Sequence, residues 1–234
     1  MSESHVVRYD LVPPQGAAHS FVLELDPETL ELQNVTSHEP PPWTALDFEQ
    51  CDGCPLQRAV RARCPAALHL APVIERWADV VSYDTVEVRV QTAERTVAAT
   101  ISAQQALASL VGLLLATSGC PRTAVFRPMA KFHLPFATEA ETAYRAAAMY
   151  LLAQYFRARS GQTPDLALAG LGRLYQSLHD VNRGLARRLR AAARQDAVVN
   201  AVVLLGIYTS LLPEALDDLL AEMRPAFAAL LDPA

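Results

Sequence analysis

Hydrophobic and polar residues alternate in several short runs within the first hundred positions of the chain. The runs are separated by proline, glycine or aspartate, which favour turns. A period of two is typical of half-buried β-strands. The pattern predicts a three-stranded meander, then a proline-rich linker (39–43) and later a β-hairpin. The predicted strands are 5–11, 19–25 and 30–35 for the meander, and 85–91 and 95–101 for the hairpin.

Apolar positions adopt helical spacing after residue 101. Two capping boxes, in which a Ser or Thr is followed three residues later by Gln or Glu, predict helix starts. They are Ser102 with Gln105, and Thr138 with Glu141. A glycine closes each of these helices. The stretch 121–137 contains three prolines and is predicted to be an ordered loop. Further helices are predicted at about 165–179, 181–195, 197–211 and 214–230.

These two halves together predict an α+β fold. A small antiparallel sheet, formed by the N-terminal meander and the hairpin, is expected to pack on a C-terminal array of helices. The chain has 234 residues, of which 51% are hydrophobic, so it can bury a sizeable core. We expect a single domain over 1–234, with a β-rich part (1–101) that contains most cysteines and a helical part (102–234).

Charge and hydropathy exclude several classes of protein. The formal net charge is −5, and an acidic chain does not favour nucleic-acid binding. The N-terminus lacks the basic and apolar regions of a signal peptide. The apolar runs 106–116 and 197–208 are shorter than the ~20 residues of a membrane span. A soluble cytoplasmic protein without a membrane partner is expected, and a homo-oligomer is compatible with the sequence.

Four cysteines are the main candidates for chemistry. The segment CDGCPLQRAVRARCP (51–65) holds three of them. Proline follows Cys54, Cys64 and the fourth cysteine, Cys120. Cys-x-x-Cys lets one turn present two thiolates to one metal, and Cys-Pro also ends a ferredoxin ligand run. The predicted function is a metal-binding protein with a structural zinc or an iron–sulfur cluster. The predicted ligands are Cys51, Cys54, Cys64 and Cys120.

Other interpretations of these residues stay open. Free cysteines also occur as small buried hydrophobic residues, and a thiol pair can be catalytic or redox-active. His133 is a fifth candidate ligand, although a histidine between Phe132 and Leu134 is also typical of a core. A thiol- or His-dependent enzyme would gather His133, Glu139 and the cysteines around one cleft. The sequence has no phosphate loop and no His-Glu-x-x-His motif, which favours a binding protein over an enzyme.

One amphipathic helix carries a row of arginines. Their spacing of four, three and four places them on one helix face. They are Arg183, Arg187, Arg190 and Arg194. This face predicts, as an alternative function, a regulatory or adaptor module that binds an anionic partner. The competing interpretation is a solvated face paired with neighbouring carboxylates.

Several longer motifs carry a family resemblance. CxxCPL and CPAALHLAPVIERW surround the first cysteines, and SGCP and PMAKFHLPFATEAET follow later. With these motifs the chain resembles an uncharacterised family of bacterial cytoplasmic proteins, a domain of unknown function. The resemblance extends over about 51–212. It implies one complete unit in which all four cysteines lie in motif-like segments, and it implies no activity, substrate or cofactor.

Overall fold

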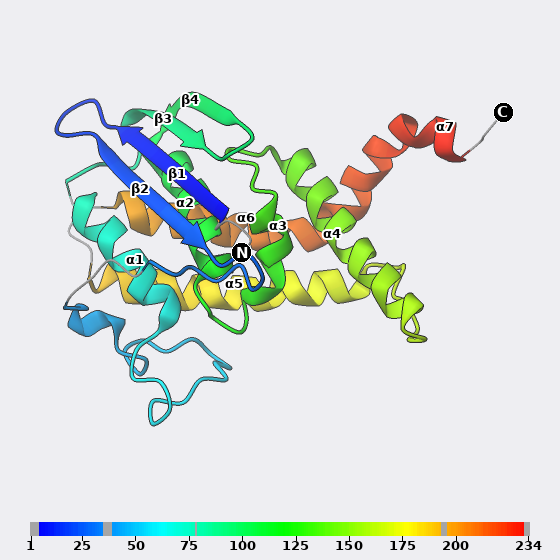
Figure 1. Ribbon diagram of the computed structural model, residues 1–234, viewed down its shortest axis with the longest axis horizontal. Helices are drawn as coiled ribbons and strands as arrows, with labels where there is room; N and C mark the ends of the chain where they lie inside the picture. Colours follow the sequence, from blue (N-terminus) through cyan, green and yellow to red (C-terminus); the bar gives the residue numbers. More distant parts are fainter. Residues whose placement is uncertain (1–4, 35–38, 78, 193–195, 232–234) are drawn as a thin grey trace.

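A four-stranded antiparallel sheet forms one face of the protein (Figure 1). The computed structural model describes residues 5–34, 39–77, 79–192 and 196–231. The strand order is β2-β1-β3-β4, so the two hairpins join along β1 and β3. The strands are β1 (His5–Val12), β2 (His19–Leu25), β3 (Thr85–Gln91) and β4 (Thr96–Ser102). The fold is therefore α+β. The predicted hairpin and the pairing of the first two strands of the predicted meander are confirmed.

The inner face of the sheet is apolar because of the period-two pattern. Tyr9 in β1 stands opposite Phe21 in β2 and Val90 in β3, and all three side chains are buried. The intervening residues of β1 and β3 face outward and are mostly polar or exposed. This alternation places the whole buried side of the sheet against the helices.

The predicted third strand of the meander is wrong. Within 30–34, only Leu32 makes an isolated bridge, to Leu25, and Leu30 has a positive φ of 57°. The backbone N–H of Leu32 donates to the carbonyl of Thr117. The other side of β1 is taken by β3, so this segment could extend the sheet only beyond β2. Residue 35 lies outside the described ranges.

The helices pack beneath and beside the sheet (Figure 1). Helix α2 contacts β3, β4 and α6, and α6 also packs along α5. The capping boxes predicted for α2 and α4 are both present. The helices are α1 (Pro65–Arg76), α2 (Ala103–Thr117), α3 (Arg127–Lys131), α4 (Glu139–Arg159), α5 (Ala169–Arg190), α6 (Ala197–Met223) and α7 (Ala228–Leu231), with short 3₁₀ turns η1 (Pro42–Thr44), η2 (Ala124–Phe126) and η3 (Arg224–Phe227).

The structure corrects two predicted breaks between helices and one predicted loop. The stretches 165–179 and 181–195 contribute to one helix, α5, and α6 continues through Pro213. Thr209, Leu212 and Leu216 are buried on one side of α6 across that proline, so tertiary packing outweighs the lost hydrogen bond. The predicted loop 121–137 contains η2 and α3, where Pro128 occupies the first turn, a position that proline tolerates.

The joined C-terminal helical segments are longer than the apolar run 197–208 that was compared with a membrane span. The apolar run 197–208 is part of a helical stretch of 35 residues, Ala197–Leu231. By length and composition, this stretch is long and apolar enough to cross a membrane, a test that core helices of soluble proteins also pass. Only 39% of its most apolar window is buried inside the protein.

The capping box at the start of α4 generates a stability prediction. The Glu141 N–H donates to Thr138 Oγ1 (3.2 Å), and the Thr138 N–H donates to Glu141 Oε2 (2.8 Å). Thr138→Ala removes the first bond and should lower the free energy of unfolding by about 1 kcal/mol. Thr138→Ser keeps the hydroxyl and should retain most of this stability. Urea unfolding of both variants tests the prediction, which equal midpoints for Ala and Ser would contradict.

Candidate functional site

Cys64 occupies the N-cap position of α1. Its backbone N–H donates to the carbonyl of Thr44 (2.8 Å), and Pro65 follows at the first helical position. Burial raises the pKa of the Cys64 thiol, and the nearby backbone N–H groups of Ala67 and Ala66 oppose that shift. The helix start therefore offers hydrogen-bond donors that would stabilise a thiolate here.

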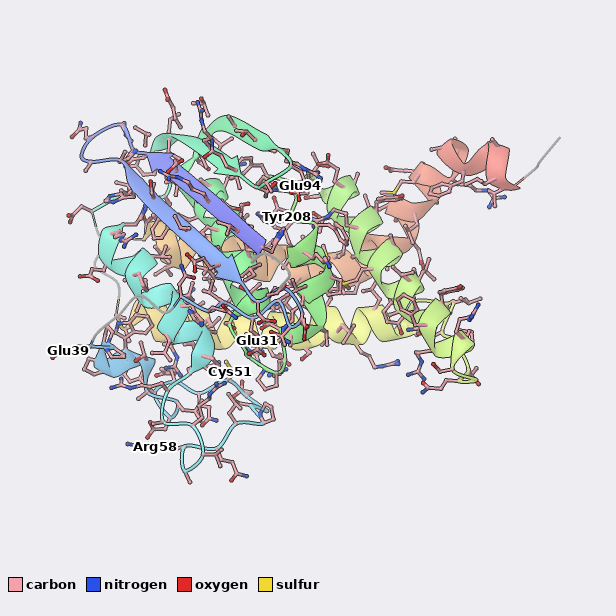
Figure 2. All side chains as sticks on the ribbon, in the orientation of Figure 1. Glu31, Glu39, Cys51, Arg58, Glu94 and Tyr208 are labelled. Carbon is pink, nitrogen blue, oxygen red and sulfur yellow. The ribbon has the colours of Figure 1, made fainter. Side chains whose placement is uncertain are left out.

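Cys51 and Cys54 share one turn that packs against α5. The Cys54 N–H donates to the Cys51 carbonyl (3.1 Å), and Gly53 within the turn has a positive φ of 67°. The Cys51 thiol points to the Val181 carbonyl at 3.9 Å. Gly184 supplies the space for this contact, because a Cβ atom there would lie 2.6 Å from Cys51 Sγ. Figure 2 shows Cys51 beneath α5.

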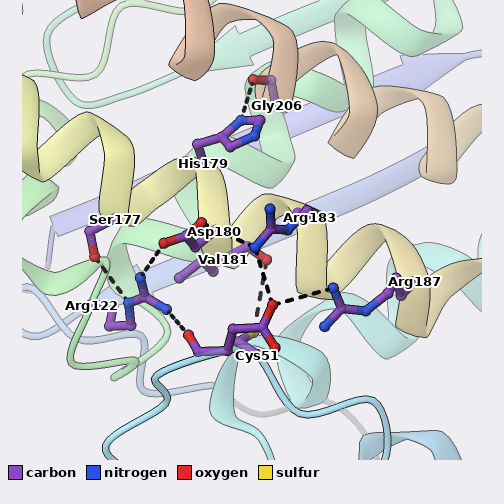
Figure 3. Close-up of polar contacts among 10 residues, drawn as sticks. Cys51, Arg122, Ser177, His179, Asp180, Val181, Arg183, Arg187 and Gly206 are labelled. Carbon is purple, nitrogen blue, oxygen red and sulfur yellow. Dashed lines mark hydrogen bonds and ion pairs between the residues drawn. The ribbon is translucent and has the colours of Figure 1, made fainter.

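Cys120 comes from the end of α2, after Gly119 with its positive φ of 80°. Arg122 ties this loop to the first cysteine turn, since its Nη1 donates to the Asp52 carbonyl (2.6 Å). The same guanidinium donates to Ser177 Oγ (3.0 Å) and Asp180 Oδ2 (3.2 Å) on α5 (Figure 3). The contacts of Arg122 thus hold the Cys120 loop and the Cys51 turn against one helix.

Cys51 and Cys64 are the cysteines whose ionisation the surroundings change. Burial, followed by repulsion from charges on Cys64, Cys120 and Cys54, raises the pKa of the Cys51 thiol to about 11. All four cysteines lie in the described ranges and are free thiols. Among the described residues, no three Cys, His, Asp or Glu side chains surround a common point where a metal ion could bind. The described residues therefore do not hold the cysteines in a closed coordination shell.

A buried arginine stands beside this cysteine cluster. Arg188 of α5 is 1% exposed, and its guanidinium donates to the carbonyls of Trp43 (2.6 Å), Ala45 (2.6 Å) and Leu46 (3.2 Å). Its positive charge lowers the pKa of Cys51 and Cys64, against the larger effect of burial. In the part of the chain that the structure describes, no carboxylate forms an ion pair with Arg188.

The predicted arginine face contacts the acidic residues of the cysteine segment. Arg183 and Arg187 pair with Asp52 (3.1 and 3.7 Å; Figure 3), and Arg187 also pairs with Glu49 (3.5 Å). Arg190, the next arginine of the face, is exposed, and Arg194 lies outside the described residues. Two members of the face thus help to attach the cysteine turn to α5.

His133 lies at a different place, beside a cavity of about 690 Å³. The Tyr9 hydroxyl hydrogen-bonds to His133 Nε2 (2.5 Å) and to Ser109 Oγ (2.7 Å). Burial, aided by the nearby Arg145 charge, lowers the pKa of His133 to about 3, so the ring is neutral at pH 7. Glu139 also lines the cavity, whereas the described lining residues include no cysteine.

Sequence reasoning missed three residues of this site. The arginine pattern does not distinguish the buried Arg188 from Arg187 and Arg190, which lie on either side of it in the sequence. Gly184 and Arg122 carry no motif of their own. One available signal was the position of Arg188 beside the buried Leu185 and Leu189, on the apolar side of α5.

The structure defines an α+β protein in which the Cys51 turn packs against α5 and Arg122 links the loop after α2 to that turn. Residues 7–228 match the family described as a domain of unknown function (DUF6901), and the chain belongs to that family. Comparison with curated proteins and comparison with solved structures both gave no match.

The contact between Gly184 and Cys51 generates a prediction with a control on the same helix. Gly184→Ala places a methyl group against Cys51 and should destabilise the protein by about 1–3 kcal/mol. Gly172→Ala meets only Pro213 Cβ at 4.0 Å and should be neutral or stabilising by up to about 1 kcal/mol. Urea unfolding of the two variants measures the difference. Equal stability would show that Cys51 can move away freely.

Proposed function

We propose that this protein binds a metal through Cys51, Cys54, Cys64 and Cys120, as a structural zinc site or an iron–sulfur cluster. One observation supports the proposal: the Cys51 thiol lies against α5, Cys54 shares its turn, and Arg122, two residues after Cys120, donates to the Asp52 carbonyl in that turn. Four thiolates complete the ligand set of either cofactor, with no cysteine left over.

Local structure supports a shift of the thiols into a coordination shell. Cys51 and Cys54 lie on a turn and Cys120 on a loop, so backbone movement of these segments would bring their sulfurs to the ~2.3 Å bonds of a zinc thiolate. The start of α1 directs N–H groups at Cys64. Protonated thiols do not attract one another, whereas a metal ion would displace their protons and draw them together.

Charge gives independent support. Removing an arginine charge from water costs several kcal/mol unless an opposite charge lies near it. Zinc with four thiolates carries a net charge of about −2, as the charges of its parts require. Such a centre would provide Arg188 with the anionic neighbour that no described carboxylate supplies. A cytoplasmic location belongs to the same proposal, because a reducing compartment keeps thiols available for metal.

The two alternative functions have less support. Arg183 and Arg187 are paired with carboxylates of the same chain, which leaves fewer charges for an anionic partner. The groups needed for a thiol- or His-dependent enzyme are divided, with His133 and Glu139 beside the cavity and Cys51 against α5.

Metal analysis of the native protein tests the proposal directly. Protein purified without oxygen should contain about one zinc or one iron–sulfur cluster per chain. Elemental analysis together with a visible absorption spectrum distinguishes the two. Cys51→Ser and Cys120→Ser should each lose the metal and unfold at lower temperature, because binding is coupled to folding. His133→Gln is the control and should keep its metal. Absence of both metals from the native protein would refute the site.

Arg188 allows a test of the charge argument. Arg188→Met should weaken metal retention by about 10–100-fold, the range typical of groups that support metal ligands. Arg190→Met changes an exposed arginine of the same helix and should have no effect. Transfer of the metal to a competing chelator measures retention.

Arg188 also binds three carbonyls, so a second variant separates charge from structure. Arg188→Lys keeps the positive charge with fewer donors and should retain more metal than Arg188→Met. If the two variants lose metal equally, the charge of Arg188 does not stabilise the site.

A further inference from the structure

Helix α4 is poorly covered by the rest of the protein. Of its 21 residues, the buried ones are Ala143, Ala146, Ala147 and Gln154. Its second half extends away from the sheet, towards the lower right in Figure 1. Most of the stability of a protein helix comes from packing of an apolar face. Because α4 buries few residues, we next describe the face that it leaves exposed.

That exposed face is apolar and has heptad spacing. Tyr144, Leu151 and Tyr155 are 51%, 39% and 54% exposed, and Ala148 between them is exposed too. Steps of four, three and four residues place these side chains on one stripe, and Leu152 (54% exposed) borders it. We call Tyr144, Ala148, Leu151, Leu152 and Tyr155 the α4 stripe.

The two ends of the stripe carry opposite charges. Glu141 precedes Tyr144 by three residues, and Arg159 follows Tyr155 by four, so both lie on the stripe face. Both residues are exposed, and within the described ranges neither is in an ion pair with another side chain of the same molecule. Two such stripes in antiparallel orientation would place each Arg159 beside the other copy's Glu141.

The exposed apolar area has the size of an interaction patch. Tyr144, Tyr155 and Phe156 are each about half exposed, and at roughly 200 Å² for each aromatic side chain they supply about 300 Å². Leu151 and Leu152 add to this area, and Phe227 contacts Tyr144 at its edge (ring centroids 6.4 Å apart). Patches of this size on a protein surface often mark an interaction site.

We propose that a second copy of this chain covers the α4 stripe, so that the protein is a two-fold symmetric dimer with the two α4 helices packed antiparallel. The two-fold axis passes near the middle of the helix, where the small Ala148 of one copy faces Leu152 of the other. Tyr144 then lies near the other copy's Tyr155, and the Glu141–Arg159 contacts close both ends. A self-complementary patch of this kind is what a two-fold interface requires.

Sedimentation of the full-length protein, as purified, over a dilution series tests this proposal. The wild type should be a dimer that dissociates on dilution. Each copy contributes one Leu152 to the interface, so Leu152→Glu places two charges there. It should raise the dimer dissociation constant by about a hundredfold. Arg157→Glu is the matched control, because Arg157 lies on another face of α4 and should leave the constant unchanged. Circular dichroism of each variant checks that the helices remain folded.

A charge exchange tests the antiparallel orientation. Arg159→Glu places like charges together and should weaken the dimer by about tenfold, and adding Glu141→Lys should restore it. Because Glu141 also caps α4, circular dichroism of Glu141→Lys alone checks that the helix stays folded. A dimer that none of these variants weakens would place the interface elsewhere. A monomeric wild type would overturn the proposal, and if that monomer floated with phosphatidylcholine vesicles, the occupant of the stripe would be a lipid surface.

Discussion

The buried guanidinium of Arg188 is the constraint on which the cysteine region depends. It binds the carbonyl groups of Trp43, Ala45 and Leu46 and so fixes the chain that leads into the cysteine segment. Backbone carbonyls accept hydrogen bonds from Nη1 and Nη2 but do not neutralise the charge. The Nε of Arg188 is buried without a hydrogen-bond partner. A buried cation without a nearby negative charge is costly. The positive charge of Arg188 therefore favours the ionised, thiolate form of Cys51 and Cys64.

Helix α5 organises the region around this charge. One face of the helix carries Arg188 and the Gly184 that accommodates Cys51, while Arg183 and Arg187 at its margin pair with the acidic cysteine turn. Arg122 adds the loop after α2 to the same helix. The cavity beside His133 and the exposed stripe of α4 lie elsewhere, so metal binding and dimer formation would use separate surfaces of one fold.

Elements with local signals were predicted correctly. The two hairpins follow from alternation and turns, and the α2 and α4 starts follow from capping residues. The errors arose where long-range contacts compete with local preference. Leu32 bonds to Thr117 instead of continuing a strand, and α6 remains helical across Pro213 because its neighbours are buried on one side. Neither contact leaves a pattern in the local sequence.

The sequence by itself determined the α+β class, the four-cysteine ligand set as a hypothesis, and the spacing that gives α4 its stripe. All of these depend on residue type and period, which are local properties. Only the tertiary structure decided that Cys120 lies near the Cys51 turn, that Gly184 makes room for Cys51, and that Arg188 is buried while Arg190 is exposed. Those outcomes depend on which helix face meets the cysteine segment, and that is set by packing between residues more than a hundred positions apart.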